Sequence, residues 1–471
     1  MRKHLFSLLA LLWLACPAFA ADKPNIIYLM MDEWGYYEAS GLGHPELKTP
    51  NIDELFLNGG MRFTQALAGG PVCGPTRATL MLGQHLGHTS MRNNGGASPI
   101  REDDITVATA LKKAGYATGG FGKWGIGARG TSGVPEKHGF DRFFGYYHQV
   151  HAHTYFPTYL IDNSKEVPLK GNTGSPFVGE TFAHDVIWDE AMGWLDDNKD
   201  KPFFLYLPVI IPHGRWGMLD DDPAWLAFKD KPWTQGQRRE TDSRMYAAMM
   251  LKIDQQIGDL VKKLEAQGLA DNTIFFLCGD NGGQDYFNDE DFPNGRFSPN
   301  VDPKTGVSFR GYKKDLYEGG LRVPMFVRWP GKIKPGSTSD HLWYFPDVFP
   351  TLTELAGTTT PKQVDGISIL PTLLGKGEQP MHDALYWEFG NQVAVRMGNW
   401  KAIRRGGAQA SWQLYDLSKD VSEANNIAAD HPEIIAKMKA IAQRERTPIR
   451  PGKIFDRNLA HKDGSVPVKS K

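Results

Sequence analysis

Short runs of apolar residues that end in polar clusters recur along the first three quarters of the chain. Residues 25–31 form such a run, and similar runs cover 117–121, 203–211 and 273–277. Unbroken apolar runs of this length, bounded by Gly and polar residues, are typical of parallel strands buried on both faces. The pattern therefore predicts at least four buried strands, each with polar residues at its carboxyl end.

Helical periodicity separates these runs. Residues 244–267 place apolar side chains at spacings of three and four and stop at Gly268, and residues 183–197 show the same spacing. Strands that alternate with helices predict an α/β fold with a doubly wound, mainly parallel sheet flanked by helices. In such folds ligands bind beyond the carboxyl ends of the strands, which is where the polar clusters fall.

The pattern of apolar and turn residues changes past residue 365. Segments 393–396, 400–403 and 412–415 are short and separated by turn residues, and a helical pattern follows from 431 to 443. We expect a large α/β domain over residues 21–365, and a smaller α+β domain with an antiparallel sheet, ending in a surface tail, over 366–471.

Two stretches between the predicted elements are unusually long and rich in Gly, Pro and Asn. They cover residues 128–180 and 282–310. Loops of this length are uncommon in compact domains unless they serve a site, so both are interpreted as functional loops.

The N-terminus has the pattern of a secretory signal peptide. A basic start at residues 2–4 precedes an apolar run at 5–15 and the small-residue sequence Ala18-Phe19-Ala20. The apolar run is shorter than the roughly 20 residues needed to span a membrane, and no later run approaches that length. We expect cleavage after Ala20, no membrane span, and a periplasmic or secreted protein.

Charge and cysteine content narrow the class of protein. The 471 residues carry 53 Lys and Arg against 54 Asp and Glu, which argues against a nucleic-acid-binding protein with its basic excess. With three cysteines, of which Cys16 leaves with the signal peptide, the chain is no disulfide scaffold. Cys278 lies in an apolar run and is expected to be inert, so Cys73 is the thiol of interest.

Cys73 opens the most specific stretch of the chain, residues 71–83. Pro75 suits the first turn of a helix that continues to about residue 82. Cys73 would then lie at the helix N-terminus, where the helix dipole and the nearby Arg77 favour negative charge. Taken alone, a buried structural cysteine is the ordinary interpretation. Cys-x-Pro-Thr-Arg followed by an apolar run and Gly resembles the signature of the sulfatase family, in which this cysteine is oxidised to formylglycine.

The resemblance extends over most of the chain in family order. Asp32 is similar to the first metal carboxylate of these enzymes, with Glu33 beside it, and Asp280-Asn281 to the second metal pair. Lys123 is similar to the lysine of the Gly-Lys motif, His213 to the histidine of the Pro-His motif, and Lys313 to the lysine that binds sulfate. Considered singly, these positions would be interpreted as a plain turn, an exposed lysine or a loop histidine.

The resemblance implies a catalytic set and a metal set. The implied catalytic residues are Cys73, Arg77, Lys123, His213 and Lys313, and the implied metal ligands are Asp32, Glu33, Cys73, Asp280 and Asn281. Hard oxygen donors suit Ca²⁺ or Mg²⁺ rather than Zn²⁺, and the family resemblance favours Ca²⁺ over Mg²⁺. Positive charge around the sulfate would stabilise the oxygens that gain charge as the S–O bond breaks. Formylglycine 73 would be the nucleophile, and His213 would give a proton to the leaving alcohol.

Two positions depart from the family pattern. Glu33 stands where a second Asp is usual, and Gly125 stands where many sulfatases carry a histidine that assists the elimination step. The loop 148–153, His148-Gln149-Val150-His151-Ala152-His153, resembles a subgroup of carbohydrate sulfatases that share the Gly-Lys-Trp-Gly variant. This loop would either supply a replacement base or contact the sugar, with a separate histidine metal site as a weaker alternative.

These observations predict an exported, formylglycine-dependent sulfatase of a sulfated polysaccharide or oligosaccharide. Aromatic-rich loops and Arg215-Trp216 suggest a sugar stacked on aromatic rings, with His151, His153 and Arg215 in contact with it. A formylglycine-generating enzyme or an anaerobic sulfatase maturase would be the processing partner. The alternatives are a phosphodiesterase or phosphonate hydrolase of the same superfamily, and a catalytically silent glycan-binding protein.

Overall fold

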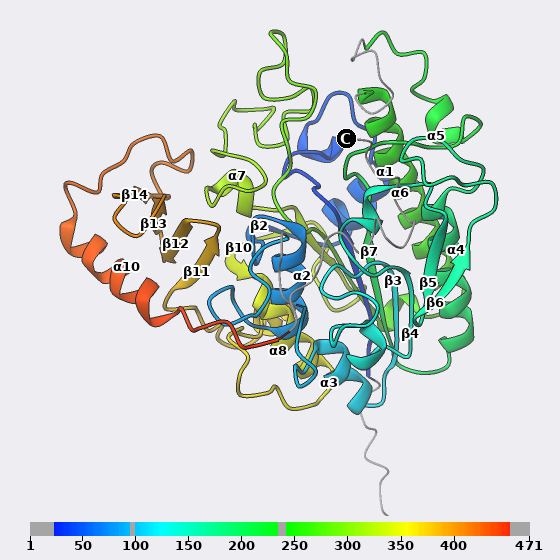
Figure 1. The fold of residues 1–471 in the computed structure, drawn as a ribbon, viewed down its shortest axis with the longest axis horizontal. Coiled ribbons are helices and arrows are strands. Elements are labelled where there is room, and N and C mark those ends of the chain that lie inside the picture. The colour runs from blue at the N-terminus through cyan, green and yellow to red at the C-terminus, as the bar shows by residue number, and fades with distance from the viewer. Residues whose placement is uncertain (1–22, 95–98, 234–241, 453–471) are drawn as a thin grey trace, which may run out of the picture.

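The computed structural model describes residues 23–94, 99–233 and 242–452. The predicted signal peptide at residues 1–20 and the end of the predicted tail lie outside these ranges. Within them the chain forms one large mixed sheet covered by helices and a second, small sheet at one side (Figure 1). The predicted α/β architecture is confirmed.

Ten strands form the large sheet, in the order β10-β2-β9-β8-β1-β7-β3-β4-β5-β6. Its centre is parallel, because β1 pairs in parallel with β7 and β8, and β3 with β7 and β4. β10 also pairs with β2 in parallel, whereas β9 is antiparallel to both its neighbours and β5 to both of its own. The strands are β1 (Asn25–Met31), β2 (Met61–Leu67), β3 (Ala117–Lys123), β4 (Arg142–Tyr146), β5 (Tyr159–Asp162), β6 (Lys165–Pro168), β7 (Phe203–Val209), β8 (Thr273–Gly279), β9 (Met325–Arg328) and β10 (Ser337–Tyr344).

Helices cover both faces of this sheet. The two long helices α4 (Ala183–Asn198) and α6 (Ser243–Ala266) lie on one face, and α2 (Cys73–Leu82), α3 (Val107–Lys113) and α8 (Val348–Leu355) lie on the other. Shorter helices are α1 (Pro50–Ile52), α5 (Pro223–Leu226), α7 (Glu318–Leu321) and α9 (Leu370–Leu374), and a π-helical turn follows α1 at Asp53–Asn58. Single 3₁₀ turns occur at Ser40–Leu42, Pro135–Lys137, His151–His153, Ala270–Asn272 and Phe345–Asp347.

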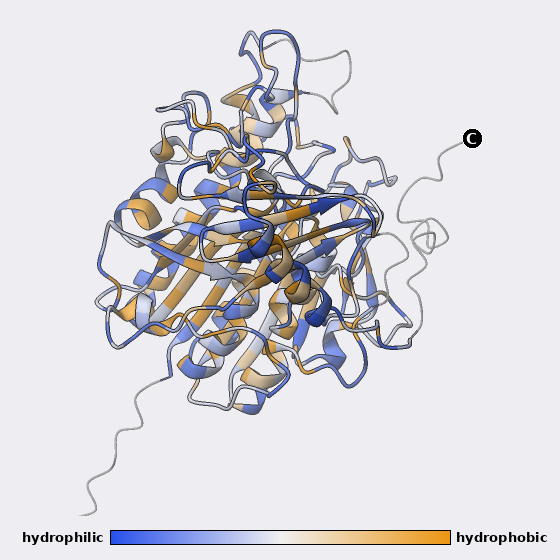
Figure 2. Ribbon diagram, turned by 90° about the vertical axis from the view of Figure 1, so that its left-hand side faces the viewer, coloured by the Kyte–Doolittle hydropathy of each residue, from blue (hydrophilic) through white to orange (hydrophobic). Residues whose placement is uncertain are grey.

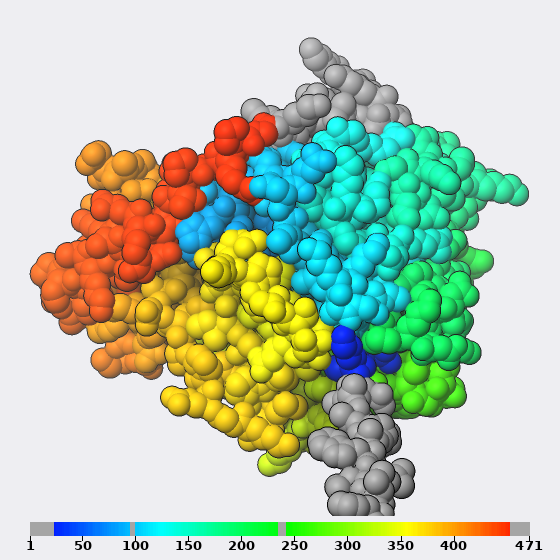
Figure 3. Space-filling model, turned by 90° about the horizontal axis from the view of Figure 1, so that it is seen from below, coloured from blue at the N-terminus to red at the C-terminus, as the bar shows by residue number. Residues whose placement is uncertain are grey.

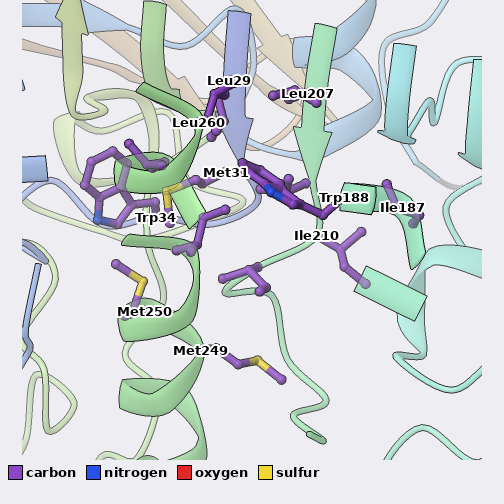
Figure 4. Packing of buried hydrophobic residues seen from close by; sticks show 14 of the residues in the cluster. Leu29, Met31, Trp34, Ile187, Trp188, Leu207, Ile210, Met249, Met250 and Leu260 are labelled. Atoms are coloured by element: carbon purple, nitrogen blue, oxygen red, sulfur yellow. The ribbon is translucent and has the colours of Figure 1, made fainter. Parts of the chain in front are cut away.

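The alternation of side chains along β1 explains the two-sided core. Ile27, Leu29 and Met31 face α4 and α6, whereas Ile26, Tyr28 and Met30 face α2, α3 and α8. Both sets are fully buried, as continuous apolar runs require of central parallel strands. Figure 4 shows the first set, with Leu29 and Met31 packed near Leu207 and Trp188, and Figure 2 shows the apolar strands running through the molecule between more polar helices.

A small antiparallel sheet forms the second unit, as predicted for this part of the chain. Its strands β11 (Leu385–Phe389), β12 (Gln392–Met397), β13 (Trp400–Arg405) and β14 (Trp412–Asp416) follow one another in sequence order, and α10 (Pro432–Arg444) packs on them through Ile435, Met438 and Ile441. The sheet begins at Leu385, while Ile369 and Leu373 still belong to the core of the large sheet.

The chain returns to the large domain after α10. Arg92 donates hydrogen bonds to Gly87 O and Thr447 O, and Arg101 donates one to Arg450 O. In the space-filling view this last described segment, in red, lies against the blue segment that follows α2 (Figure 3).

The stretch 128–180 differs from its interpretation as a single long loop, because β4, β5 and β6 lie within it and extend the large sheet. These strands have only four or five residues each, too short to show an apolar period. The stretch 282–310 has no strand beyond the isolated bridge between Val301 and Ser308. No helix of the described residues combines the length and apolar character needed to cross a lipid bilayer.

Candidate active site

Four adjacent parallel strands, β8, β1, β7 and β3, end at the same edge of the large sheet. Because their carboxyl ends converge, residues far apart in sequence meet there. Asp32 follows β1, Asp280 follows β8, His213 follows β7 and Lys123 is the last residue of β3. Backbone contacts fix this arrangement: the N–H of Asp280 donates to Met31 O and that of Asp32 to Ile211 O.

Cys73 is the first residue of α2, with Val72 as its extended N-cap residue. Its Sγ lies 3.2 Å from Asp32 Oδ1 and 3.6 Å from Lys313 Nζ. Burial and the charge of Asp32 raise the pKa of the Cys73 thiol, in spite of the nearby Lys123. Desolvation thus opposes the negative charge that the helix N-terminus favours.

Two buried cations flank the carboxylates. Lys123 Nζ donates to Asp32 Oδ2 at 2.5 Å, and Arg77 Nη2 donates to Asp280 Oδ2 at 3.0 Å. Arg77 Nη1 also donates to the carbonyl oxygen of Lys123 at 2.5 Å, so the two cations are held together. Both side chains are fully buried. Lysine and arginine are almost never fully buried unless they are paired with an opposite charge. Lys123 and Arg77 therefore belong to a buried charged site rather than to a solvated surface.

The carboxylates and the amide form a donor set that fits a hard cation. Burial and the charge of Asp32 raise the pKa of Asp280 to about 7. Burial alone would raise the pKa of Asp32, but Lys123, His213 and Arg77 hold it well below its usual value. Asn281 Oδ1 is buried and has no hydrogen-bond partner among the described residues. An unpartnered amide oxygen beside two buried carboxylates is the arrangement that a divalent cation would complete.

Glu33 differs from an ordinary ligand in its backbone and its contacts. Its φ of 66° lies in the left-handed region, and its N–H donates to Asp280 Oδ1 at 3.0 Å. Its Oε1 lies 2.9 Å from His213 Nε2 and is in direct contact with Lys313 Nζ, and its Oε2 accepts a hydrogen bond from Tyr286. The side chain of Glu33, one methylene longer than that of Asp, thus contacts His213, Lys313 and Tyr286. Its backbone N–H binds Asp280 of the implied metal set.

His213 faces the pocket together with His153, and their rings stack at 4.8 Å between centroids. His213 Nδ1 contacts the carbonyl oxygen of Gly214 while its Nε2 faces Glu33. Burial lowers the pKa of His213, and the charge of Asp32 opposes this. His153, which was predicted to contact the substrate, therefore lies at the pocket beside the histidine that the family motif identifies.

His151 is not brought to this site. It is fully buried, its Nε2 contacts Tyr159 O at 2.9 Å, and burial lowers its pKa to about 4. The expectation that it touches substrate is not met, because His151 is buried within the 3₁₀ turn at His151–His153, whereas His153 lines the pocket. Trp216 is likewise buried against Tyr246 and Tyr286, which leaves no free ring face for a sugar, while the adjacent Arg215 is partly exposed.

A pocket of about 530 Å³ opens over Glu33, His213 and Lys313. Several of its lining residues were missed from the sequence, because nothing in their local pattern marks them. They are Val72, Asn93, Asn94, Gln284, Tyr286, Lys314, Phe389 and Gly390. Phe389 and Gly390 come from the turn between β11 and β12, so the small domain contributes to the wall of the pocket. Asn94 contacts the Cys73 motif, because its Oδ1 accepts a hydrogen bond from the Gly74 N–H at 2.9 Å. This is a tertiary contact, which the sequence pattern does not reveal.

A second group of possible ligands lies at His85, His88 and Asp365. His85 Nδ1 accepts the Gly87 N–H, which leaves the ring proton on Nε2 to donate to Glu445 Oε2 at 3.2 Å. His88 Nδ1 lies 2.9 Å from Asp365 Oδ2. These groups thus satisfy one another as an ionic contact that ties the end of α10 to the large domain.

Comparison with known proteins agrees with this geometry. The model of the sulfatase family matches residues 24–358, and that of the N-sulphoglucosamine sulphohydrolase C-terminal region matches residues 310–447. N-acetylgalactosamine-6-O-sulfatase of Bacteroides thetaiotaomicron is 29% identical, covering 91% of this chain and 94% of its own length. Human arylsulfatase A is 29% identical, covering 92% of this chain and 89% of its own.

Solved structures give the same result. The crystal structure of Ps i-CgsB in complex with k-i-k-neocarrahexaose superposes with a TM-score of 0.74 at 26% identity, covering 95% of this chain and 98% of that one. The family uses a formylglycine and a divalent metal, and in this chain Asp32, Glu33, Cys73 and His213 form a group that could hold an ion. The chain therefore belongs to the sulfatase family and is a sulfuric ester hydrolase.

Proposed function

We propose that this protein is an exported sulfatase that removes sulfate from a polysaccharide or oligosaccharide, with residue 73 oxidised to formylglycine and a bound Ca²⁺. One observation carries the proposal: Cys73 starts α2 with its Sγ between a carboxylate of the metal-ligand set and Lys313 at the pocket. A nucleophile in that place touches both the cation site and the space that an anionic ester would enter.

The charges around residue 73 suit a sulfate monoanion. Lys313 is 7% exposed at the pocket and would bind a sulfate oxygen, while the buried Lys123 and Arg77 neutralise the carboxylates behind it. Hydrated formylglycine supplies an oxygen nucleophile that cysteine cannot. His213 is 13% exposed beside Lys313 and is the residue placed to give a proton to the leaving alcohol.

Asp32, Glu33, Asp280 and Asn281 would hold the cation. All of their ligand atoms are oxygens, which favours Ca²⁺ or Mg²⁺ over Zn²⁺. Ca²⁺ is the better fit, because it accepts a mixed and irregular set of protein oxygens, whereas Mg²⁺ demands near-ideal octahedral geometry and retains waters. The cation would polarise the oxygen that residue 73 carries and neutralise buried negative charge.

A carbohydrate substrate is supported by two kinds of observation. The names of the relatives include an N-acetylgalactosamine-6-O-sulfatase, and the solved structure of Ps i-CgsB contains a neocarrahexaose. The pocket wall combines amide groups at Asn93, Asn94 and Gln284 with the aromatic ring of Phe389. Sugars are bound by such mixtures of hydrogen-bonding groups and ring faces.

Export and processing follow from the sequence. The predicted signal peptide at residues 1–20 would bring the chain to the periplasm or the exterior, and a formylglycine-generating enzyme or an anaerobic maturase would oxidise Cys73. Peptide mass spectrometry tests the modification, because conversion lowers the residue mass by about 18 Da. Unmodified Cys73 in protein from the native host would contradict the formylglycine mechanism.

The activity is tested by sulfate release from a panel of sulfated glycans and aryl sulfates, with protein co-produced with a maturase. We expect release from at least one sulfated oligosaccharide and none from the Cys73→Ala variant. No release from any member of the panel would leave the glycan-binding alternative. Matched phosphate esters test the phosphodiesterase or phosphonate hydrolase alternative, which predicts faster turnover of the phosphate than of the sulfate.

A further inference from the structure

Gly125, the position where many sulfatases carry a histidine, has its side-chain space filled by another residue. A Cβ built on Gly125 would lie 2.5 Å from Gln149 Nε2, closer than real contacts allow. Gln149 comes from the loop after β4 and is 5% exposed. The departure from the family pattern at 125 is thus matched by a compensating side chain 24 residues further along.

The carboxamide of Gln149 is oriented by one hydrogen bond. Its Nε2 donates to the carbonyl oxygen of Gly125 at 3.1 Å. The opposite orientation would set two acceptors against each other, so the amide group faces Gly125 and Oε1 faces away from it. Gln149 Oε1 is buried and has no hydrogen-bond partner among the described residues. A buried acceptor left unsatisfied costs free energy, which calls for a donor that the functional protein supplies.

The amide lies against the turn that carries residue 73. A Cβ on Gly74 would lie 3.2 Å from Gln149 Nε2, and Arg77 Cδ approaches the same space at Gly125 to 3.2 Å. Gly74 directly follows Cys73, and Arg77 is one helical turn beyond it. Gln149 therefore lies against the first turn of α2, the helix that residue 73 begins.

The count of donors at residue 73 changes on maturation. The Cys73 thiol has one S–H, and Asp32 Oδ1 accepts it at 3.2 Å. Hydrated formylglycine has two O–H groups, so a second acceptor is required in a buried place. We propose, on the basis of the formylglycine function proposed above, that Gln149 Oε1 accepts a hydrogen bond from one hydroxyl of hydrated residue 73. Gln149 is a positioning residue here, since a carboxamide takes up no proton at neutral pH.

The test compares Gln149→Leu with the wild-type protein and with a matched control. Leu keeps the approximate volume but offers no acceptor. Gln267→Leu is the control, because Gln267 Oε1 also has no partner among the described residues, while its Nε2 binds Asp196 of α4. Gln267 follows the C-terminal end of α6 and is not among the residues that line the pocket. Conversion of Cys73, measured by peptide mass, is first shown to be equal in all three proteins.

We expect kcat of Gln149→Leu to fall about 10- to 100-fold, the equivalent of one hydrogen bond to a charged or developing-charge group, with KM within about twofold. A second readout does not depend on turnover. Loss of the acceptor shifts residue 73 from hydrate toward aldehyde, so labelling of the folded variant by methoxyamine becomes faster. Gln267→Leu leaves both quantities unchanged.

An unchanged kcat and labelling rate in Gln149→Leu would overturn the proposal, and so would a lower kcat without faster labelling, which would assign Gln149 to packing alone. If Gln149→Leu does not fold, Gln149→Ala provides the same two readouts with less steric demand. Failure of the proposed function is separately visible in the wild type, as absence of formylglycine or of sulfate release.

Discussion

Two clusters of fully buried charges lie in this molecule, one at the strand ends and one between the two domains. At the strand ends Asp32 and Asp280 face Lys123 and Arg77. Between the domains Glu318 Oε1 accepts from Lys401 Nζ at 2.9 Å. Both clusters pair carboxylates with Lys and Arg side chains, and both are buried.

The clusters differ in the kind of group that is left without a hydrogen-bond partner. Glu318 at the start of α7 also accepts two hydrogen bonds from Arg322, and Lys401 Nζ lies 3.0 Å from Glu423 Oε1. Lys401 and Arg322 accordingly hold the pKa of Glu318 below its usual value, against the effect of burial. At the strand ends Asn281 Oδ1 has no hydrogen-bond partner in the described part of the chain, and the pKa of Asp280 is raised. In the domain cluster each carboxylate lies against a cation of the protein, although Arg396 Nη1 and Glu423 Oε1 have no hydrogen-bond partner among the described residues. At the strand ends the unpartnered atom is a neutral amide oxygen beside carboxylates, which is a donor set that a bound cation would complete.

The largest expected effect separates chemistry from stability. Cys73→Ala removes the proposed nucleophile, so sulfate release falls by at least about 10³-fold while the thermal midpoint stays within about 2 °C, since Cys73 has no partner that the fold requires. Cys278→Ala is the control: the Cys278 side chain lies in the core between β8 and the helices α2, α3 and α8, and the variant keeps its activity at a cost of about 1–2 kcal/mol. Substantial sulfate release by Cys73→Ala, measured with ion chromatography, would show that another group performs the attack.

Removal of the metal is the next prediction. Dialysis against a chelator abolishes sulfate release, because the ion that would polarise the oxygen of residue 73 is removed. The folded state also loses the stabilisation of the bound ion. Ca²⁺ restores activity at lower concentration than Mg²⁺. Circular dichroism during the titration separates loss of the ion from loss of the fold. Full activity in excess chelator would contradict the metal site.

Lys401→Met tests how much the ion pairs of the domain cluster contribute to stability. The substitution leaves Glu318 and Glu423 as buried carboxylates without their shared cation, and we expect a loss of about 3–5 kcal/mol in the free energy of unfolding. Lys419→Met, which removes an 82% exposed lysine paired with Asp416, changes it by less than about 0.5 kcal/mol. Chemical denaturation measures both. Equal effects of the two variants would mean that the buried cluster is no more important than a surface pair.

The pH dependence of stability also tests the buried charges of the domain cluster. Burial and the charge of Glu318 raise the pKa of Glu423 to about 7 from its usual 4.5. A carboxyl group with a raised pKa in the folded state keeps its proton while the unfolded chain ionises, so its contribution to stability falls as pH rises from about 4.5 to 7. Glu423→Gln removes this term, and its stability relative to wild type should improve over that interval by up to about 3 kcal/mol. A difference between the two proteins that does not change with pH would refute the assignment.

The smallest expected effect concerns the contribution of the small domain to the pocket. Phe389→Ala removes an aromatic wall from the turn after β11, and we expect KM for a sulfated oligosaccharide to rise about three- to tenfold with kcat little changed. Met381→Ala, which truncates a 59% exposed side chain outside the pocket, serves as control. A KM that is the same in Phe389→Ala and wild type would place the sugar elsewhere.

Many of the central strands and long helices were predictable from the local pattern of apolar residues. The apolar runs located β1, β3, β7 and β8, and the helical spacing located α4 and α6 to within one or two residues. The three strands within 128–180 were not, because strands of four or five residues leave too little periodicity to detect. The structure was therefore needed to locate these three strands within the long stretch.

The sequence by itself determined the motif at Cys73, the polar residues that follow the central strands, and hence the family. These features are local, and the rule that parallel strands end together makes them converge. Only the tertiary structure decided that His151 is buried and His153 is not, that Gln149 fills the space at Gly125, and that Phe389 reaches the pocket from the small domain. Such placements depend on contacts between segments far apart in the chain, and a contact of that kind leaves no mark on the pattern of either segment.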